Sequence, residues 1–120
     1  MAIRTNGDSA FVGTSSLNVF APTPSSNNYT LVLADKDRFL ELNNSTTAAT
    51  LTVPPNSSVP FPIGTQISMV QIASGQFTVT PGSGVTINSA SGLKIRTQWS
   101  SATLVKRSTD AWVLVGDLSV

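Results

Sequence analysis

The C-terminal part of the chain reads Ala102-Thr103-Leu104-Val105-Lys106-Arg107, then Ser108-Thr109-Asp110, then Ala111-Trp112-Val113-Leu114-Val115-Gly116-Asp117-Leu118. Two apolar runs on either side of a short polar turn predict two β-strands. The second run is apolar at successive positions from Trp112 to Val115. Because neighbouring residues of a strand point to opposite faces, this strand carries apolar side chains on both faces of its sheet.

Both faces of this strand must be covered. The second layer of a sandwich covers one face, and a partner subunit is the simplest cover for the other, since an exposed apolar sheet face favours aggregation. The alternative is a central strand that is buried on both sides within the monomer. We expect core or subunit-interface positions at Leu104, Trp112, Leu114 and Leu118.

Strands with turn signals about every eight to twelve residues extend upstream to residue 29. We expect about eight strands and no helix longer than a turn. Two hairpins are predicted, one joining residues 29–33 to 39–42 and one joining residues 66–72 to 76–80. The fold class expected is all-β, a compact antiparallel sandwich, barrel-like or β-prism domain over residues 29–120.

Residues 1–28 show neither the helical nor the strand period, and they end in a stretch rich in Pro, Ser and Asn. Apolar residues are nevertheless scattered through this segment. We interpret it as an extended N-terminal arm that docks on a partner, with a flexible tail as the alternative. The residues expected to make the partner contact are Ile3, Phe11, Leu17, Val19 and Phe20.

The composition and charge of this chain limit the classes of partner that it can bind. Its 120 residues fit one domain, and seven Lys/Arg stand against six Asp/Glu, for a formal net charge of +1. The basic residues are spread along the chain, which argues against nucleic acid as a partner. We expect all of them to be solvated strand-edge or interface charges: Arg4, Lys36, Arg38, Lys94, Arg96, Lys106 and Arg107.

No stretch of the sequence has the length or apolarity of a membrane span or of a secretory signal. We therefore expect no membrane partner, and synthesis and folding in the cytoplasm.

The residues that carry most enzyme chemistry are missing. The chain has no His and no Cys, so the commonest general base, the thiol nucleophile and the usual zinc ligands are absent. Asp35 and Asp37 lie two residues apart, but a calcium loop needs more oxygen ligands, so we expect a charged hairpin tip there. We predict no catalytic residue, no metal and no cofactor, and regard an enzyme that works through carboxylates alone as poorly supported.

Two tryptophans differ in their surroundings. Trp112 lies within an apolar strand and is expected in the core or an interface. Trp99 lies between Gln98 and Ser100 and is the better candidate of the two for an exposed aromatic ring that contacts a glycan, but we expect even this ring to be buried.

Seven segments carry a resemblance to a known family: Tyr29-Thr30-Leu31-Val32-Leu33-Ala34-Asp35, Leu40-Glu41-Leu42-Asn43, Leu51-Thr52-Val53-Pro54-Pro55-Asn56-Ser57-Ser58, Phe61-Pro62-Ile63-Gly64-Thr65-Gln66-Ile67, Gly75-Gln76-Phe77-Thr78-Val79, Ala102-Thr103-Leu104-Val105-Lys106-Arg107 and Trp112-Val113-Leu114-Val115-Gly116-Asp117-Leu118. Their order over residues 29–118 resembles a β-rich module of tailed-bacteriophage virion proteins, found in head decoration (cement) proteins and in tail-fibre or minor tail proteins. The resemblance does not reach the arm.

The resemblance implies a place on the particle surface, a homotrimer and no catalytic residues. In tail fibres such a module is usually part of a much longer chain, whereas this chain begins at Met1 and carries an arm. The expected function is therefore that of a capsid decoration protein on the outer surface of the phage head, with the major capsid protein as its partner. The alternative is a tail-fibre or receptor-binding module that recognises host surface glycans.

Overall fold

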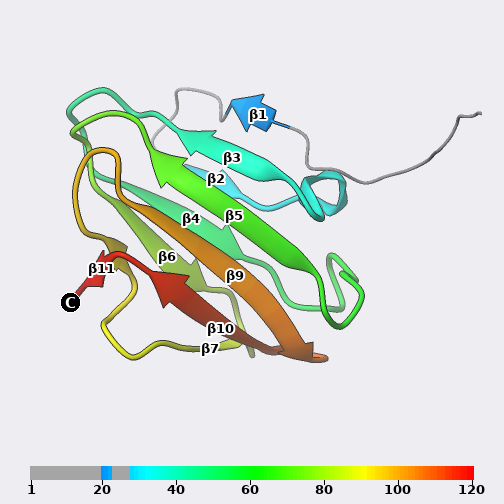
Figure 1. Cartoon of the computed structure of the whole chain (residues 1–120). Coiled ribbons are helices and arrows are strands. Elements are labelled where there is room, and N and C mark those ends of the chain that lie inside the picture. The colour runs from blue at the N-terminus through cyan, green and yellow to red at the C-terminus, as the bar shows by residue number, and fades with distance from the viewer. Residues whose placement is uncertain (1–19, 23–27) are drawn as a thin grey trace, which may run out of the picture.

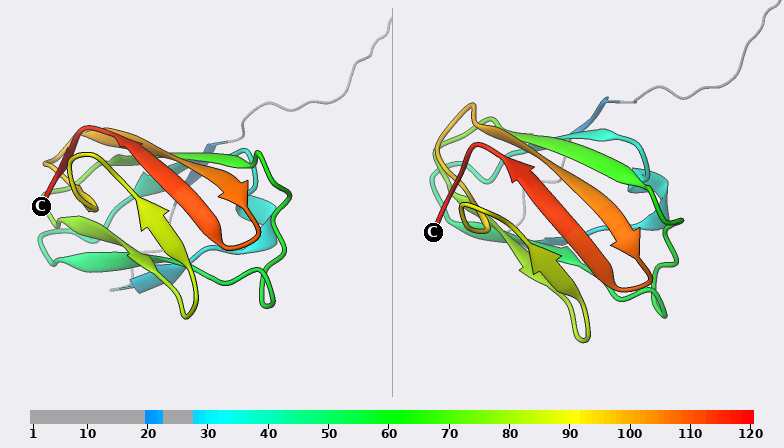
Figure 2. Two further views of the ribbon diagram at one scale, coloured as in Figure 1. Left: turned by 90° about the horizontal axis from the view of Figure 1, so that it is seen from below. Right: turned by 60° about the horizontal axis from the view of Figure 1, so that its bottom comes forward.

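The computed structural model describes residues 20–22 and 28–120, which form two β-sheets packed face to face (Figures 1 and 2). The expectation of an all-β fold with two layers is confirmed. Within the described residues the single helical element is a 3-10 turn, η1 (Leu33–Asp35), and no helix there has the length and apolarity that a bilayer span requires.

The first sheet, called sheet A, has six strands and the second, sheet B, has five. In spatial order sheet A contains β1 (Phe20–Pro22), β3 (Phe39–Leu42), β5 (Gln66–Gln71), β9 (Ser101–Ser108), β10 (Ala111–Gly116) and β7 (Thr86–Asn88). Sheet B contains β11 (Leu118–Ser119), β8 (Lys94–Ile95), β6 (Phe77–Pro81), β4 (Ala49–Val53) and β2 (Asn28–Thr30).

The chain changes sheet after nearly every strand. From β1 to β9, each strand lies in the opposite sheet from the strand before it, so the chain winds as a flattened coil (Figure 1). Strands that are neighbours within a sheet therefore run parallel in β1–β3–β5 and in β2–β4–β6. The hairpin of β9 and β10 ends this winding with antiparallel pairing.

This topology corrects two expectations. Pairing is not antiparallel throughout, because parallel and antiparallel pairs occur in both sheets. The two hairpins predicted over residues 29–42 and 66–80 are also wrong, since β2 and β3, and likewise β5 and β6, belong to opposite sheets. The alternation of apolar residues predicted these strands correctly, but it does not distinguish a tight turn within a sheet from a connection that crosses to the other one.

The core lies between the sheets and is filled by alternate residues of each strand. In β4, for example, Leu51 and Val53 are buried while Thr50 and Thr52 are only half-buried. The positions expected in the core or a subunit interface are buried within the single chain: Leu104, Trp112, Leu114 and Leu118. Phe61 closes this region, with its ring edge-on to Trp112 at a centroid distance of 5.6 Å.

Lys106 corrects the expectation that every basic side chain is solvated. It is 2% exposed, because it lies on the inward-pointing side of β9 together with Ala102 and Leu104. Its Nζ donates to Asn56 Oδ1 at 2.8 Å and to the Phe61 carbonyl at 2.7 Å. Burial lowers the pKa of Lys106 because it disfavours the charged ammonium, while the negative charge of Asp110 acts in the opposite direction.

Asp35 is likewise not part of a charged hairpin tip. Its carboxylate is buried and accepts the Tyr29 hydroxyl at 2.6 Å and the Val32 N–H at 3.0 Å, which holds η1 against β2. Burial and the Asp35 carboxylate raise the pKa of Tyr29. Asp37, two residues on, is exposed as expected and pairs with Lys36.

Replacing Lys106 with Met tests the buried ammonium. Methionine keeps an apolar stem but no donor, so the buried Phe61 carbonyl and the half-buried Asn56 side chain lose their partner. We expect Lys106→Met to lower the free energy of unfolding by about 1–3 kcal/mol in urea titrations. Arg107→Met, on the exposed neighbour, is the control and should change it by less than about 0.5 kcal/mol. Equal stability of the two variants would contradict the assigned role.

Candidate functional site

The outer faces of the two sheets differ in chemistry. On sheet B, the outward residues of β4 and β6 are threonines: Thr50, Thr52, Thr78 and Thr80. On sheet A, the outward residues of the central strands include four valines, Val70, Val105, Val113 and Val115, which we call the valine face. The prediction that the Trp112 strand carries apolar side chains on both faces is thus confirmed.

The valine face has a polar centre. Val105 lies opposite Val113, and Val115 lies opposite Thr103, whose hydroxyl is 3.0 Å from that of Ser68. Val115 is 53% exposed and the other three valines are half-buried. A surface with apolar side chains around a satisfied hydroxyl pair suits contact with another protein better than catalysis, since none of these groups titrates.

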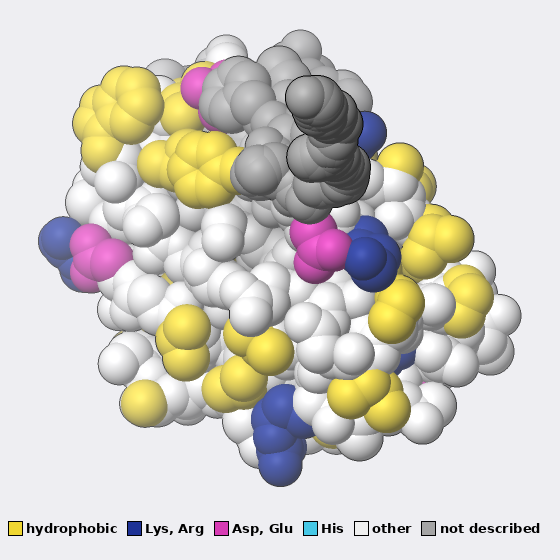
Figure 3. Space-filling model, turned by 45° about the vertical axis from the view of Figure 1, so that its right-hand side comes forward, with side chains coloured by type: hydrophobic (Ala, Val, Ile, Leu, Met, Phe, Trp, Pro, Cys, Tyr) yellow, Lys and Arg dark blue, Asp and Glu magenta, His cyan; other side chains and the backbone are white. Residues whose placement is uncertain are grey.

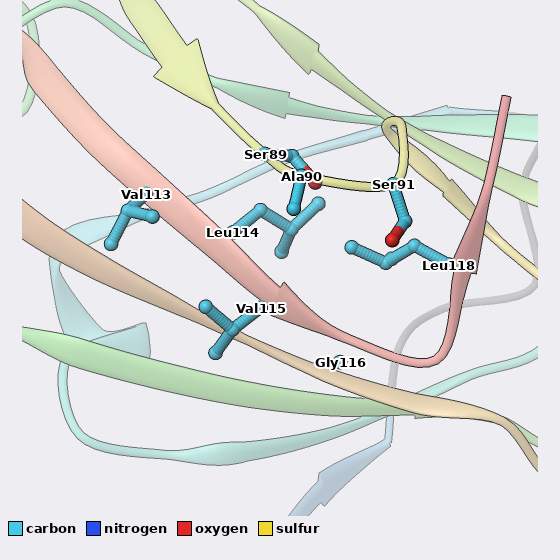
Figure 4. A pocket seen from close by; sticks show the side chains of 8 residues that line it. All are labelled: Ser89, Ala90, Ser91, Val113, Leu114, Val115, Gly116 and Leu118. Atoms are coloured by element: carbon cyan, nitrogen blue, oxygen red, sulfur yellow. The ribbon is translucent and has the colours of Figure 1, made fainter.

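A groove of about 220 Å³ opens beside β10 (Figure 4). It forms because β7 accompanies β10 only from Ala111 to Val113, after which the chain turns away. The lining is apolar side chains, backbone and serine: Ser89, Ala90, Ser91, Val113, Leu114, Val115, Gly116 and Leu118. The Ser89 hydroxyl donates to the Gly92 carbonyl at 2.7 Å. With no ionisable side chain in its lining, the groove offers no acid or base.

Trp99 projects from the turn between β8 and β9. Its side chain is 68% exposed, which corrects the expectation that even this ring is buried, and its backbone has a positive φ of 72°. That conformation is unfavourable for a bulky residue and requires support from its surroundings. The support comes from β5, since the Trp99 N–H donates to the Gln71 carbonyl at 2.6 Å and the Gln71 N–H donates to the Ser100 carbonyl at 3.0 Å.

An ion pair lies at the base of the same turn. Arg96 donates to Asp117 through Nε at 2.7 Å and through a terminal guanidinium nitrogen at 2.8 Å, and the Ser100 hydroxyl donates to the same carboxylate at 2.7 Å. These donors lower the pKa of Asp117 to about 2. The Arg96 N–H also donates to the Asp117 carbonyl, so the turn is tied to the end of β10.

The arm residues are mostly beyond what the structure describes. Ile3, Phe11, Leu17 and Val19 lie outside the described residues, and their contact with a partner stays a prediction. Phe20 is the first residue of β1, paired in parallel with Phe39 of β3. Phe20–Pro22 of the predicted arm are thus the edge strand of sheet A, and its last residue, Asn28, begins β2 of sheet B, so the expected boundary between arm and domain at residue 28 is wrong.

Figure 3 shows one face of the molecule, where hydrophobic side chains form small separate groups among uncharged polar atoms. Among the described residues there is no cluster of three or more Asp, Glu, His or Cys side chains that could hold a metal ion.

No protein-family model matches the chain, and no curated protein matches it.

The ion pair gives a test by titration. We expect Arg96→Gln to raise the pKa of Asp117 from about 2 toward its ordinary value of 3.8, as followed by carboxyl chemical shifts in NMR. Because the folded-state pKa is the lower one, the stabilisation is present above the ordinary pKa and is lost as the pH falls toward 2. Lys36→Gln, in the separate pair with Asp37, should leave Asp117 unchanged. An unchanged pKa in Arg96→Gln would refute the assignment.

Proposed function

We propose that this chain is a structural protein of a tailed-phage particle, a capsid decoration protein that binds the assembled head and stabilises it. The observation that supports this most is the valine face, an apolar outer surface on a sheet whose inner face already fills the core. The resemblance of residues 29–118 to phage virion modules supports the same function. The proposed partners are further copies of the chain, as a homotrimer, and the major capsid protein.

The position of β1 places the arm and the valine face on the same sheet, with β1 at the edge far from β10. β1 pairs with β3 in sheet A, so the chain before Phe20 joins the domain at the edge of the sheet that carries the valine face. An arm that begins there can reach across the same partner surface that the face contacts. This placement suits a protein that spans neighbouring coat subunits.

The proposed stabilisation of the phage head does not require catalysis. A protein that binds the assembled lattice and not its separated subunits shifts the equilibrium toward the lattice by mass action, and many copies multiply the effect. The low share of charged residues, 11% of the chain, limits the desolvation cost of covering such a face.

Paired substitutions on the two outer faces test this proposal. We expect Val113→Asp with Val115→Asp to weaken co-sedimentation with heads lacking the protein by at least about tenfold, because each buries a carboxylate at the contact. The matched control is Thr52→Asp with Thr80→Asp on the outer face of sheet B, which should bind as the wild type does. Circular dichroism and size-exclusion chromatography with light scattering report folding and oligomeric state. Equal binding by both double variants would contradict docking through the valine face.

A further inference from the structure

Trp99 combines two features that a stable fold does not require. Its indole is 68% exposed, and its φ of 72° is one that residues with a Cβ rarely adopt. Residues held in such conformations cluster at binding and functional sites, where the surrounding structure maintains them. The turn therefore holds a large aromatic ring outward at a cost to the fold.

The backbone that carries the ring is also held in place before any ligand arrives. Gln71, at the end of β5, bonds through its backbone to the Trp99 N–H and to the Ser100 carbonyl. The Gln98 side chain donates from Nε2 to the carbonyl of the next residue, Ile72, at 3.2 Å. The Ser100 N–H closes the turn on the Thr97 carbonyl at 3.1 Å. Because this backbone is already ordered, the turn loses little conformational entropy on binding, which favours its use as a platform for the ring.

The charged groups at the base of the Trp99 turn neutralise each other in an ion pair. Arg96 and Asp117 are exposed and form a bidentate pair, and Asp117 also binds the hydroxyl of Ser100, the residue that follows Trp99. The guanidinium has five N–H donors, of which this pair uses two, so donors remain for a ligand. No charged residue occurs in the turn itself, from Thr97 to Ser100.

We propose that this turn is a binding site for a neutral sugar, with the apolar face of a pyranose ring stacked on Trp99 and its hydroxyls bonded to the Arg96–Asp117 pair. The site does not depend on the capsid contact proposed above and gives the chain a second, adhesive role on a glycan-bearing surface. A nucleic acid is a poorer ligand, because its phosphates need unpaired cations and the nearest cation, Arg96, is already neutralised.

A single site of this kind binds a sugar weakly, but many copies of the chain on one particle bind the same surface together and raise the overall affinity. When many copies face the same glycan surface, each binding event raises the effective concentration for the next. A single exposed ring per copy is then sufficient for attachment.

Glycan-array screening of the full chain, followed by NMR titration with neutral methyl pyranosides, tests the site. We expect Trp99→Asn to weaken binding at least about tenfold while the melting temperature stays equal or rises, since asparagine tolerates a positive φ. Ile63→Asn is the matched control, because Ile63 is 66% exposed elsewhere and should leave binding unchanged. Arg96→Gln should weaken binding with less effect than the loss of the ring.

Salt dependence separates neutral from charged ligands. Binding of a neutral sugar should change little between low and high ionic strength, since no net charge is neutralised. The proposal is overturned if the wild type binds no neutral sugar, if Trp99→Asn binds as well as the wild type, or if only acidic glycans bind with steep salt dependence. None of these outcomes bears on head binding through the valine face.

Discussion

Gln71, at the end of β5, makes the hydrogen bonds on which both the core and the exposed turn depend. Its buried side chain accepts the Phe77 N–H at 3.0 Å and donates to the Ala73 carbonyl at 3.0 Å, which guides the chain from sheet A to sheet B. Its backbone binds Trp99 and Ser100 on the other side. The side chain of Gln71 thus supports the crossing between the sheets, and its backbone supports the turn before β9.

The positions of the strands could be predicted from the sequence, but the sheet to which each strand belongs could not. The alternation of apolar and polar residues predicted the strands, and it placed Leu104, Trp112 and Leu114 correctly because burial follows a period of two. It did not show that β5 and β6 lie in opposite sheets, since that depends on a buried glutamine whose partners are not marked by any local pattern. Lys106 could have been predicted, because it continues the inward series of Ala102 and Leu104.

The candidate sites were predictable to different degrees. The apolar residues on both faces of β10 are visible in the sequence itself, which predicts Val113 and Val115, whereas Val70 and Val105 join the valine face only through the order of the strands in sheet A. The polar neighbours of Trp99 made it the better candidate for exposure, but burial of its ring was expected, because its positive φ and its support by Gln71 are set by tertiary contacts. The Arg96–Asp117 pair joins residues 21 apart in the sequence, and only the folded chain brings them together.

Together these features describe a two-layer domain with an apolar outer face on sheet A and, at one turn, an exposed aromatic ring on a hydrogen-bonded backbone. The central claim is that the chain decorates the phage head, and the most direct measurement is its molar ratio to the major capsid protein in purified particles, by quantitative mass spectrometry. The account predicts a fixed ratio set by the lattice sites of the head. A ratio that instead matches the tail proteins would contradict it and favour a tail-fibre or receptor-binding module.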